Sequence, residues 1–255
     1  MRNLYLFVWL LLGLFISSCN KDDNNNSQDS TNNFNSQICN TISGASAVYW
    51  DYAHGLPTGL TQIPTISNPG GQFIHSQYPG LGFTYPAGYT ATEILIPEVQ
   101  ALGVNVLRND NNALWRYIPS ITLQGNVGVN SIIASEINAM FSQLNFNGTP
   151  NVLCTTTQTG SIGGGFQNTF GARFIQFGTF RALVWVNTIY EPSLNVTFAS
   201  LSVSYATTNE FDNEVLNTFL PISFQLLIIS DGVRDSDADG FPDNQDNFPF
   251  DPTRH

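Results

Sequence analysis

Residues 196–205 read Val-Thr-Phe-Ala-Ser-Leu-Ser-Val-Ser-Tyr, and apolar and polar side chains alternate along most of them. Because successive side chains of a strand point to opposite faces of a sheet, this alternation predicts a β-strand. One face would carry Thr197, Ala199, Leu201, Val203 and Tyr205, and the other would carry Val196 and Phe198 with the serines at 200, 202 and 204. The stretch therefore favours a β-rich fold.

Segments on both sides of this stretch extend the same pattern. Residues 174–186 form a long run of aromatic and branched side chains, and residues 104–107 and 114–123 also have strand composition. Ile222, Phe224, Leu226 and Ile228 alternate again, which predicts a further strand. Residues 190–195 contain a proline between two predicted strands and are interpreted as a hairpin connection.

One helix is predicted, at about 131–145. Ile133, Ile137, Met140, Phe141 and Leu144 recur at steps of three and four residues, which places them on one apolar face. Asn130 or Ser131 is the expected N-cap, and Asn147-Gly148 ends the helix. Residues 44–92 are expected to form short strands and loops, and residues 97–102 one or two helical turns. The predicted fold class is α+β, mainly β: an antiparallel sheet or sandwich with one packed helix, over residues 39–230.

The charges of the chain are few and unevenly distributed. Charged residues make up 11% of the sequence, and the net charge is −11. Seven of the 19 acids lie within residues 231–255, whereas residues 39–230 hold only four arginines. Because no basic patch is present to neutralise phosphates, nucleic acid is excluded as a partner. The local excess of acids points instead to a cation.

The N-terminus has the pattern of an export signal. Arg2 precedes an apolar run from Leu4 to Ile16, which is too short for a permanent membrane span of about 20 residues. Ile16-Ser17-Ser18-Cys19 follows and resembles a bacterial lipobox. That resemblance implies a signal peptide over residues 1–18 and a diacylglycerol on the thiol of Cys19, with palmitate among its acyl chains. Several acyl chains hold a protein on a membrane stably, whereas one chain is marginal.

Residues 19–38 are almost wholly polar and are expected to form a lipidated, flexible, disordered tether. Lys21, Asp22 and Asp23 follow Cys19 closely. They resemble the export signal that routes some lipoproteins of Gram-negative bacteria to the exterior face of the outer membrane. The resemblance implies a chain anchored in the outer membrane and facing the cell exterior. The alternative is a polar tether with incidental charges.

Two cysteines remain once Cys19 carries lipid. Cys39 and Cys154 form an even pair in an oxidising compartment, and we expect them to form a disulfide. Two separate buried thiols are the alternative.

Residues 39–230 contain no recognisable catalytic motif. Residues 159–163 have threonine where a nucleophile elbow needs its first glycine, and residues 160–165 are interpreted as a hairpin loop. Glu93 and Glu98 are the nearest approach to paired glycosidase carboxylates. Aromatic side chains in the 44–92 region are the better candidates for ligand contact, namely Trp50, Tyr52, Tyr78 and Tyr85. Alternatively, these rings cover the open side of the sheet.

The most specific motif is acidic and lies near the C-terminus. Residues 235–246 place Asp235, Asp237, Asp239, Asp243 and Asp246 around Gly240, with the carbonyl of Phe241 between them. Oxygen ligands at this spacing are what Ca²⁺ prefers, as in the EF-hand loop. A predicted strand before the loop and prolines after it disfavour a true EF-hand.

Residues 231–255 instead resemble a thrombospondin type 3 repeat. The pattern Asp-x-Asp-x-Asp-Gly-x-x-Asp-x-x-Asp is present, and Asp231-Gly232 to Asp235 recurs as Asp239-Gly240 to Asp243. The family implies Ca²⁺ bound along a chain with little core of its own. This segment departs from the family in being a single copy, with Phe248 where many members have cysteine.

The sequence thus predicts a surface-exposed lipoprotein with a calcium-binding C-terminus. Its central domain would act as a binding or adhesion-type module for a glycan or protein ligand, without being an enzyme. The alternatives are a hydrolase that acts on glycans and a structural component of the cell envelope.

Overall fold

A computed structural model describes residues 42–53, 60, 62, 64–78, 81–96, 101–161, 166–226, 241, 245–248 and 254. The predicted signal peptide, Cys19, the export signal, Cys39 and the tether lie outside these residues. So do Asp235, Asp237, Asp239 and Asp243 of the predicted calcium loop.

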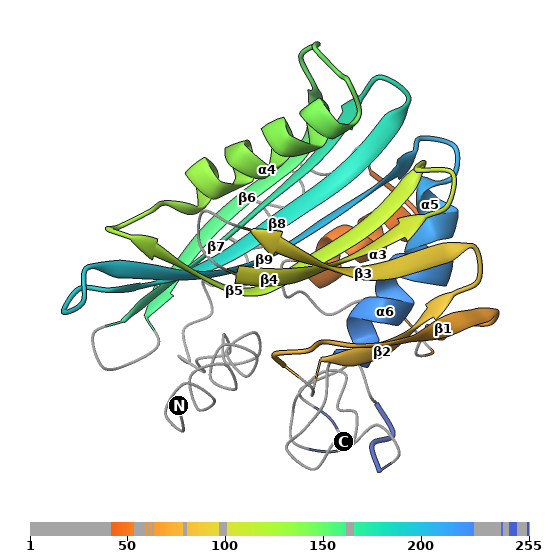
Figure 1. Cartoon of the computed structure of the whole chain (residues 1–255), viewed down its shortest axis with the longest axis horizontal. Coiled ribbons are helices and arrows are strands. Elements are labelled where there is room, and N and C mark those ends of the chain that lie inside the picture. Colours follow the sequence, from red (N-terminus) through yellow and green to blue (C-terminus); the bar gives the residue numbers. More distant parts are fainter. Residues whose placement is uncertain are drawn as a thin grey trace.

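The main structural element is a sheet of seven strands in the order β3-β4-β5-β9-β8-β7-β6, with every neighbouring pair antiparallel (Figure 1). Its strands are β3 (Tyr89–Ile96), β4 (Ala101–Arg108), β5 (Ala113–Gln124), β6 (Asn151–Ser161), β7 (Gln167–Phe177), β8 (Phe180–Glu191) and β9 (Val196–Thr207). The fold class predicted from the sequence, α+β and mainly β, is confirmed. The alternating stretch that favoured it forms β9, the central strand.

Helix α4 (Val129–Gln143) covers one face of the sheet and joins β5 to the far edge strand β6 (Figure 1). The sequence predicted this helix at about 131–145, and in the structure it begins two residues earlier. Its N-cap is Gly128 rather than Asn130 or Ser131, and no side chain caps it. Ile133 and Met140 are buried against the sheet. A Cβ atom on Gly171 of β7 would lie 2.9 Å from Val129 Cγ2, so the close approach of helix and strand requires glycine there.

The opposite face is covered by several further elements, most of which the sequence analysis did not predict. They are α3 (Ala45–Ala53), α5 (Phe211–Glu214), the π-helical turn η1 (Val215–Phe219), α6 (Leu220–Gln225) and the small sheet of β1 (Pro69–Ile74) and β2 (Gly82–Pro86). Aromatic rings fill this layer: Tyr49 of α3 lies 5.7 Å from Phe219, and Phe211 lies 5.3 Å from Phe174 of β7. The sheet therefore has a core on each face.

The strand predicted at residues 222–228 is wrong over residues 222–225, because residues 211–225 are helical. Residues 227 and 228 lie outside the described residues. Phe211, Val215, Phe219 and Ile222 follow one another at steps of four, four and three, and all four are fully buried. Pro221 lies in the first turn of α6, where its missing N–H has no cost. A proline removes a hydrogen bond of a regular α-helix and kinks or breaks it. The π-helical turn, which departs from regular α-helix, lies immediately before α6.

The strand composition of residues 174–186 is confirmed: they span the end of β7 and the start of β8, which meet at a tight hairpin where Gly178 has φ of +51°. Two further expectations need correction. Residues 44–92 contain helix α3 as well as strands and loops. Ala101 and Leu102 belong to β4 rather than to a helical turn, and residues 97–100 lie outside the described residues. The connection predicted at residues 190–195 is confirmed as a hairpin, with β8 extending to Glu191.

Candidate functional site

Two of the four aromatic residues predicted to contact a ligand pack inside the fold. Trp50 is on α3 with only 2% of its surface exposed, so its proposed place on an exposed loop is wrong. Tyr52 is partly buried, and its ring lies 4.9 Å from that of Phe224 on α6. The reason is local: residues 45–53 form a helix whose rings face the sheet, as the alternative interpretation had it.

Tyr78 and Tyr85 belong to the small β1–β2 sheet and its connection, and both remain partly exposed. The ring of Tyr78 lies 4.9 Å from the ring of His75, which is fully buried. His75 Nδ1 accepts the backbone N–H groups of Gln77 and Tyr78, each at 3.2 Å. These bonds assign the proton to Nε2, 3.3 Å from the carbonyl oxygen of Leu102. The histidine therefore shapes this turn, and its Nδ1 lies 3.6 Å from Oε1 of Glu93.

Glu93 of β3 forms hydrogen bonds with the same turn. Its carboxylate accepts hydrogen bonds from the backbone N–H and the hydroxyl of Ser76. The backbone bond is the main reason that the pKa of Glu93 is below its usual value, with His75 adding a small effect. Glu98, its proposed partner in a glycosidase pair, lies outside the described residues. The described geometry gives Glu93 a turn-stabilising role.

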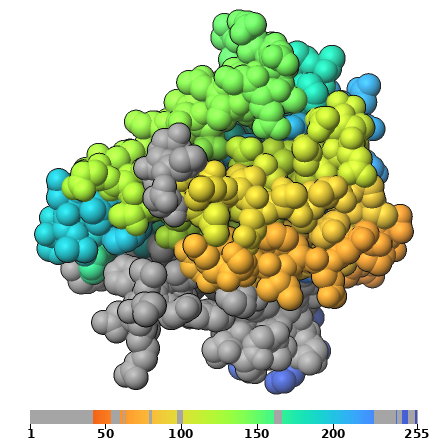
Figure 2. Space-filling view, in the orientation of Figure 1, coloured from red at the N-terminus to blue at the C-terminus, as the bar shows by residue number. Residues whose placement is uncertain are grey.

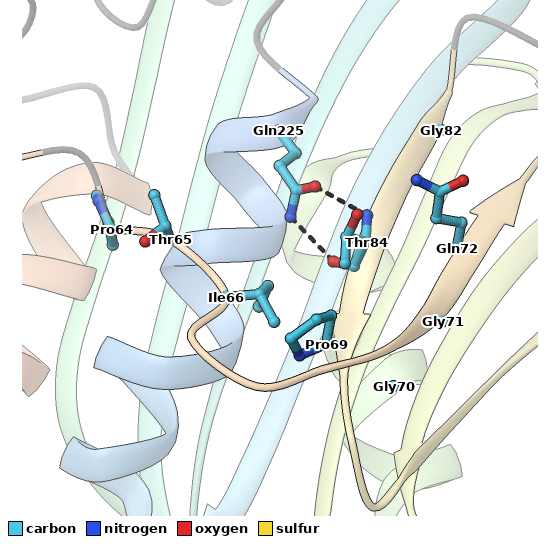
Figure 3. A pocket seen from close by; sticks show the side chains of 10 residues that line it. All are labelled: Pro64, Thr65, Ile66, Pro69, Gly70, Gly71, Gln72, Gly82, Thr84 and Gln225. Atoms are coloured by element: carbon cyan, nitrogen blue, oxygen red, sulfur yellow. Dashed lines mark hydrogen bonds between the residues drawn. The ribbon is translucent and has the colours of Figure 1, made fainter.

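An open groove of about 800 Å³ runs beside the small sheet (Figure 3). Its lining is Pro64, Thr65, Ile66, Pro69, Gly70, Gly71, Gln72, Gly82, Thr84 and Gln225. Gln225, at the end of α6, accepts the backbone N–H of Thr84 at 2.8 Å and donates to its carbonyl at 2.9 Å. This side-chain amide occupies the backbone groups of β2 that a third strand would otherwise use. The described lining has no ionisable group, so it offers hydrogen bonds and apolar contact without acid–base chemistry.

The residues of β1 and β2 form an exposed band along one side of the molecule, next to β3 and β4 (Figure 2). Ile74 of β1 is 67% exposed and Gln72 is exposed, whereas the rings of Phe73 and Phe83 lie 5.3 Å apart, tilted by 33°, on the inner side. Phe83 in turn lies 5.5 Å from Trp115 of β5. The band is thus fixed to the main sheet by its inner rings and presents its other face to solvent.

The strongest electrostatic cluster surrounds Arg108 at the end of β4. Its guanidinium donates to Asp110 at 2.8 Å, to Glu210 at 2.8 Å and to Glu214 at 2.6 Å. Glu214 is buried and also accepts the hydroxyls of Tyr89 and Thr218. The Arg108 guanidinium lowers the pKa of Asp110 to about 2 and lowers that of Glu210. This cluster joins α5 to the sheet. No local sequence pattern predicts it, because α5 and β4 are far apart in the chain.

The predicted calcium loop is described at two of its six positions. Phe241 is 40% exposed, and Asp246 accepts the backbone N–H of Phe248 through Oδ1 at 2.7 Å. The other oxygen of Asp246, Oδ2, is shielded from solvent and has no hydrogen-bond partner within the described part of the chain. Across the described residues, no group of three or more His, Cys, Asp or Glu side chains converges on one centre. The four other aspartates lie outside those residues.

Cys154 is fully buried in β6 and is disulfide-bonded. Its predicted partner, Cys39, lies outside the described residues, so the pairing of these two cysteines stays a prediction. None of the helices described is long and apolar enough to cross a membrane.

Comparison with known proteins adds little. No family model matches the chain, and no curated protein does so. Among solved structures, the Ran-binding protein Mog1p of Saccharomyces cerevisiae aligns with 62% of this chain and 89% of its own, at 14% identity and a TM-score of 0.30. A likeness with that TM-score carries no argument about function.

Proposed function

We propose that this chain is a lipid-anchored, externally displayed binding or adhesion-type module whose C-terminal segment holds Ca²⁺. The lipobox-like Ile16-Ser17-Ser18-Cys19 and the following Lys21-Asp22-Asp23 support the anchor and its export to the outer membrane. The domain behind the tether supplies a rigid sheet with helices on both faces. Such a scaffold suits a protein that presents a surface to a glycan or protein ligand.

One observation carries the calcium part of the proposal: the unpaired carboxylate oxygen of Asp246. A buried carboxylate oxygen without a partner is costly, and a bound cation removes that cost. Asp246 occupies the closing position of the Asp-rich loop, where the resemblance to thrombospondin type 3 repeats places a calcium ligand. Asp235, Asp237, Asp239, Asp243 and the carbonyl of Phe241 would supply the remaining oxygens, and bound Ca²⁺ would neutralise their mutual repulsion.

The uncharged groove beside the small sheet supports a binding role over hydrolysis. Hydrolysis of a glycosidic bond requires two carboxyl groups facing one another across a cleft. The described lining of the groove offers only amide, hydroxyl, backbone and apolar groups. Gln225, which lines this groove, ends α6 six residues before Asp231 in the sequence.

Thermal unfolding of the full chain in detergent, with and without calcium, tests the ion site. Extracellular calcium modules bind at about 10⁻⁴–10⁻³ M. Calcium at roughly ten times Kd contributes about 1.4 kcal/mol, which corresponds to a rise in Tm of about 3–5 °C. Asp246→Asn should abolish this rise. The matched control is Glu191→Gln, which removes an exposed acid at the β8–β9 turn and should leave the calcium response intact. A melting temperature indifferent to millimolar calcium, or an unchanged response in Asp246→Asn, would contradict the proposal.

A further inference from the structure

The open groove beside the small sheet has a floor made by the outer face of two strands. Gln72 of β1 and Thr84 of β2 are direct cross-strand partners, so their side chains lie on the same face of this sheet. The next pair along, Phe73 and Phe83, packs with the core. Gln72 and Thr84 therefore point away from the core and into the groove, where Figure 3 shows them beside one another.

The groove is open to solvent and continues along β1. A smaller hollow of about 280 Å³ shares Gln72, Gly82 and Thr84 with the groove and extends it to Ile74, which is 67% exposed. The 6 residues of β1 span roughly 17 Å at about 3.3 Å a residue. A ligand of several linked units can therefore lie along the strand from the solvent side, without entering the core.

The polar groups of this surface are neutral side chains rather than the edge of a strand. Gln72 and Thr65 are exposed and Thr84 is partly exposed, so two hydroxyls and one amide face the groove. Each of these groups can both donate and accept a hydrogen bond. The backbone N–H and carbonyl of Thr84 are already bound by the Gln225 amide, at 2.8 and 2.9 Å. A ligand in the groove would therefore be recognised by side chains.

Apolar surface lies next to these polar groups. Pro64, Ile66 and Pro69 line the same groove, and Figure 3 shows the segment that carries Pro64 and Ile66 passing between α6 and the small sheet. Proline rings are rigid, so contact with them orders few rotatable bonds. The groove thus combines a rigid apolar side with a hydrogen-bonding floor, which is the usual composition of a site for a small organic ligand.

The charge of the protein restricts the ligand to a neutral one. The described lining holds no ionisable side chain, and the whole chain has a net charge of −11. An anionic ligand would find no cation in this lining and would be repelled by the field of the chain. A cationic ligand would find no carboxylate there to compensate for its lost hydration.

A neutral saccharide fits this surface better than a peptide does. Every residue of a docked peptide brings an N–H and a carbonyl that need partners, and Gln225 occupies the strand groups of Thr84 that would supply them. A sugar ring carries its hydroxyls at its rim. Some of them can bond to Gln72 and the threonines while the others stay in water on the open side, and the apolar ring face can lie against proline and isoleucine.

We propose that this groove binds a neutral oligosaccharide laid along β1. The inference rests on the proposed role as a binding module and deepens it by naming the site and the ligand class. Ligand-observed NMR by saturation transfer, with the full chain in detergent, tests it against maltohexaose, cellohexaose and mannohexaose at millimolar concentrations. At least one of the three should receive saturation from the protein, and a hexamer of galacturonic acid, which is anionic, should receive none.

Two substitutions and a matched control place the binding in the groove. Gln72→Ala should weaken saccharide binding about five- to tenfold, and Thr84→Val about two- to fivefold, because each removes neutral hydrogen bonds to the ligand. Neither changes the backbone groups that Gln225 holds. The control is Gln158→Ala, which removes an exposed glutamine on β6, at the other edge of the main sheet, and should leave binding unchanged.

Three results would overturn the proposal. They are saturation of none of the three neutral hexasaccharides, equal binding of a neutral serine–alanine–proline peptide, and the same affinity in Gln72→Ala as in Gln158→Ala. Exposed Gln72 contributes little to the fold, so Gln72→Ala should keep the wild-type Tm, and lost binding could not be ascribed to unfolding. The calcium response and the lipid label do not involve this groove, so failure here is distinguishable from failure of the proposed function.

Discussion

Replacing Arg108 with methionine is expected to lower the free energy of unfolding by about 3–5 kcal/mol. The substitution leaves Glu214, whose side chain is only 7% exposed, buried without its cationic partner at 2.6 Å. Tyr89 and Thr218 would still donate to that carboxylate, but neither carries a positive charge. The contact between helix α5 and the sheet would then contain a buried negative charge without a positive partner. Urea unfolding monitored by circular dichroism measures the loss.

Asp110→Asn is the matched control for this prediction. Asp110 binds the same guanidinium, but its side chain is 49% exposed, and a solvent-exposed ion pair contributes at most about 1 kcal/mol. The double variant Arg108→Met with Glu214→Leu should recover most of the stability, because removing both charges removes the unpaired one. A single Arg108→Met variant as stable as Asp110→Asn would show that Glu214 does not depend on the ion pair.

The same cluster predicts how stability changes with pH. The pKa of Asp110 in the folded protein is about 2, below its usual 3.8, and that of Glu210 is also lowered. A carboxyl group whose pKa is lowered by folding stabilises the fold above its unfolded pKa. That contribution disappears as pH falls through the folded pKa. The wild type should therefore lose stability between about pH 4 and pH 2, and Arg108→Met should lose less over the same range.

Phe219→Ala is expected to cost about 3–5 kcal/mol of the free energy of unfolding, because it empties the centre of the aromatic layer. Phe219 is fully buried, with its ring 5.7 Å from that of Tyr49 and 5.8 Å from that of Phe211. Helix α3 reaches the sheet through these rings, so the cavity would loosen α3 as well as the π-helical turn. Equilibrium unfolding in guanidinium chloride gives the magnitude.

Leu216→Ala in the same π-helical turn is the control for Phe219→Ala. Leu216 is 47% exposed, and its truncation should change stability by less than about 0.5 kcal/mol. The two residues are three positions apart in this turn; Phe219 is fully buried, whereas Leu216 is partly exposed to solvent. Equal effects of the two substitutions would mean that residues 211–225 do not present the helical face described above.

The periodicity of apolar residues predicted the elements whose pattern is complete within one short stretch of sequence. The alternation of 196–205 identified β9, and steps of three and four identified α4 within two residues. The strand prediction at 222–228 was wrong because Ile222, Phe224 and Leu226 alternate with Ser223 and Gln225, so a short window matches a strand. The longer spacing from Phe211 to Ile222 carries the helical signal. Whether residues 174–186 turn back at Gly178 depends on one glycine within an otherwise continuous apolar run.

Features of the fold and of the candidate sites depend on contacts that no local pattern encodes. The three serines of β9 alternate with apolar residues and would suit a solvated face, yet β9 is the central strand and all three are buried. The sequence does not show that both faces of this strand are covered, because that follows only from the order of the strands in the sheet. Arg108 and Glu214 are likewise separated by more than a hundred residues. The Asp-rich loop and Cys19 are the reverse case, because the predictions made for them rest on motif spacing alone.

Metabolic labelling with radioactive palmitate in a Gram-negative host tests the membrane anchor, the central claim of the proposed function. The wild-type chain should take up label and partition into the detergent phase. Cys19→Ala should lose both properties, whereas Ser18→Ala, which keeps a small residue before the cysteine, should retain them. An unlabelled wild-type chain, or label that persists in Cys19→Ala, would contradict the proposal that this protein is held at the cell surface by lipid.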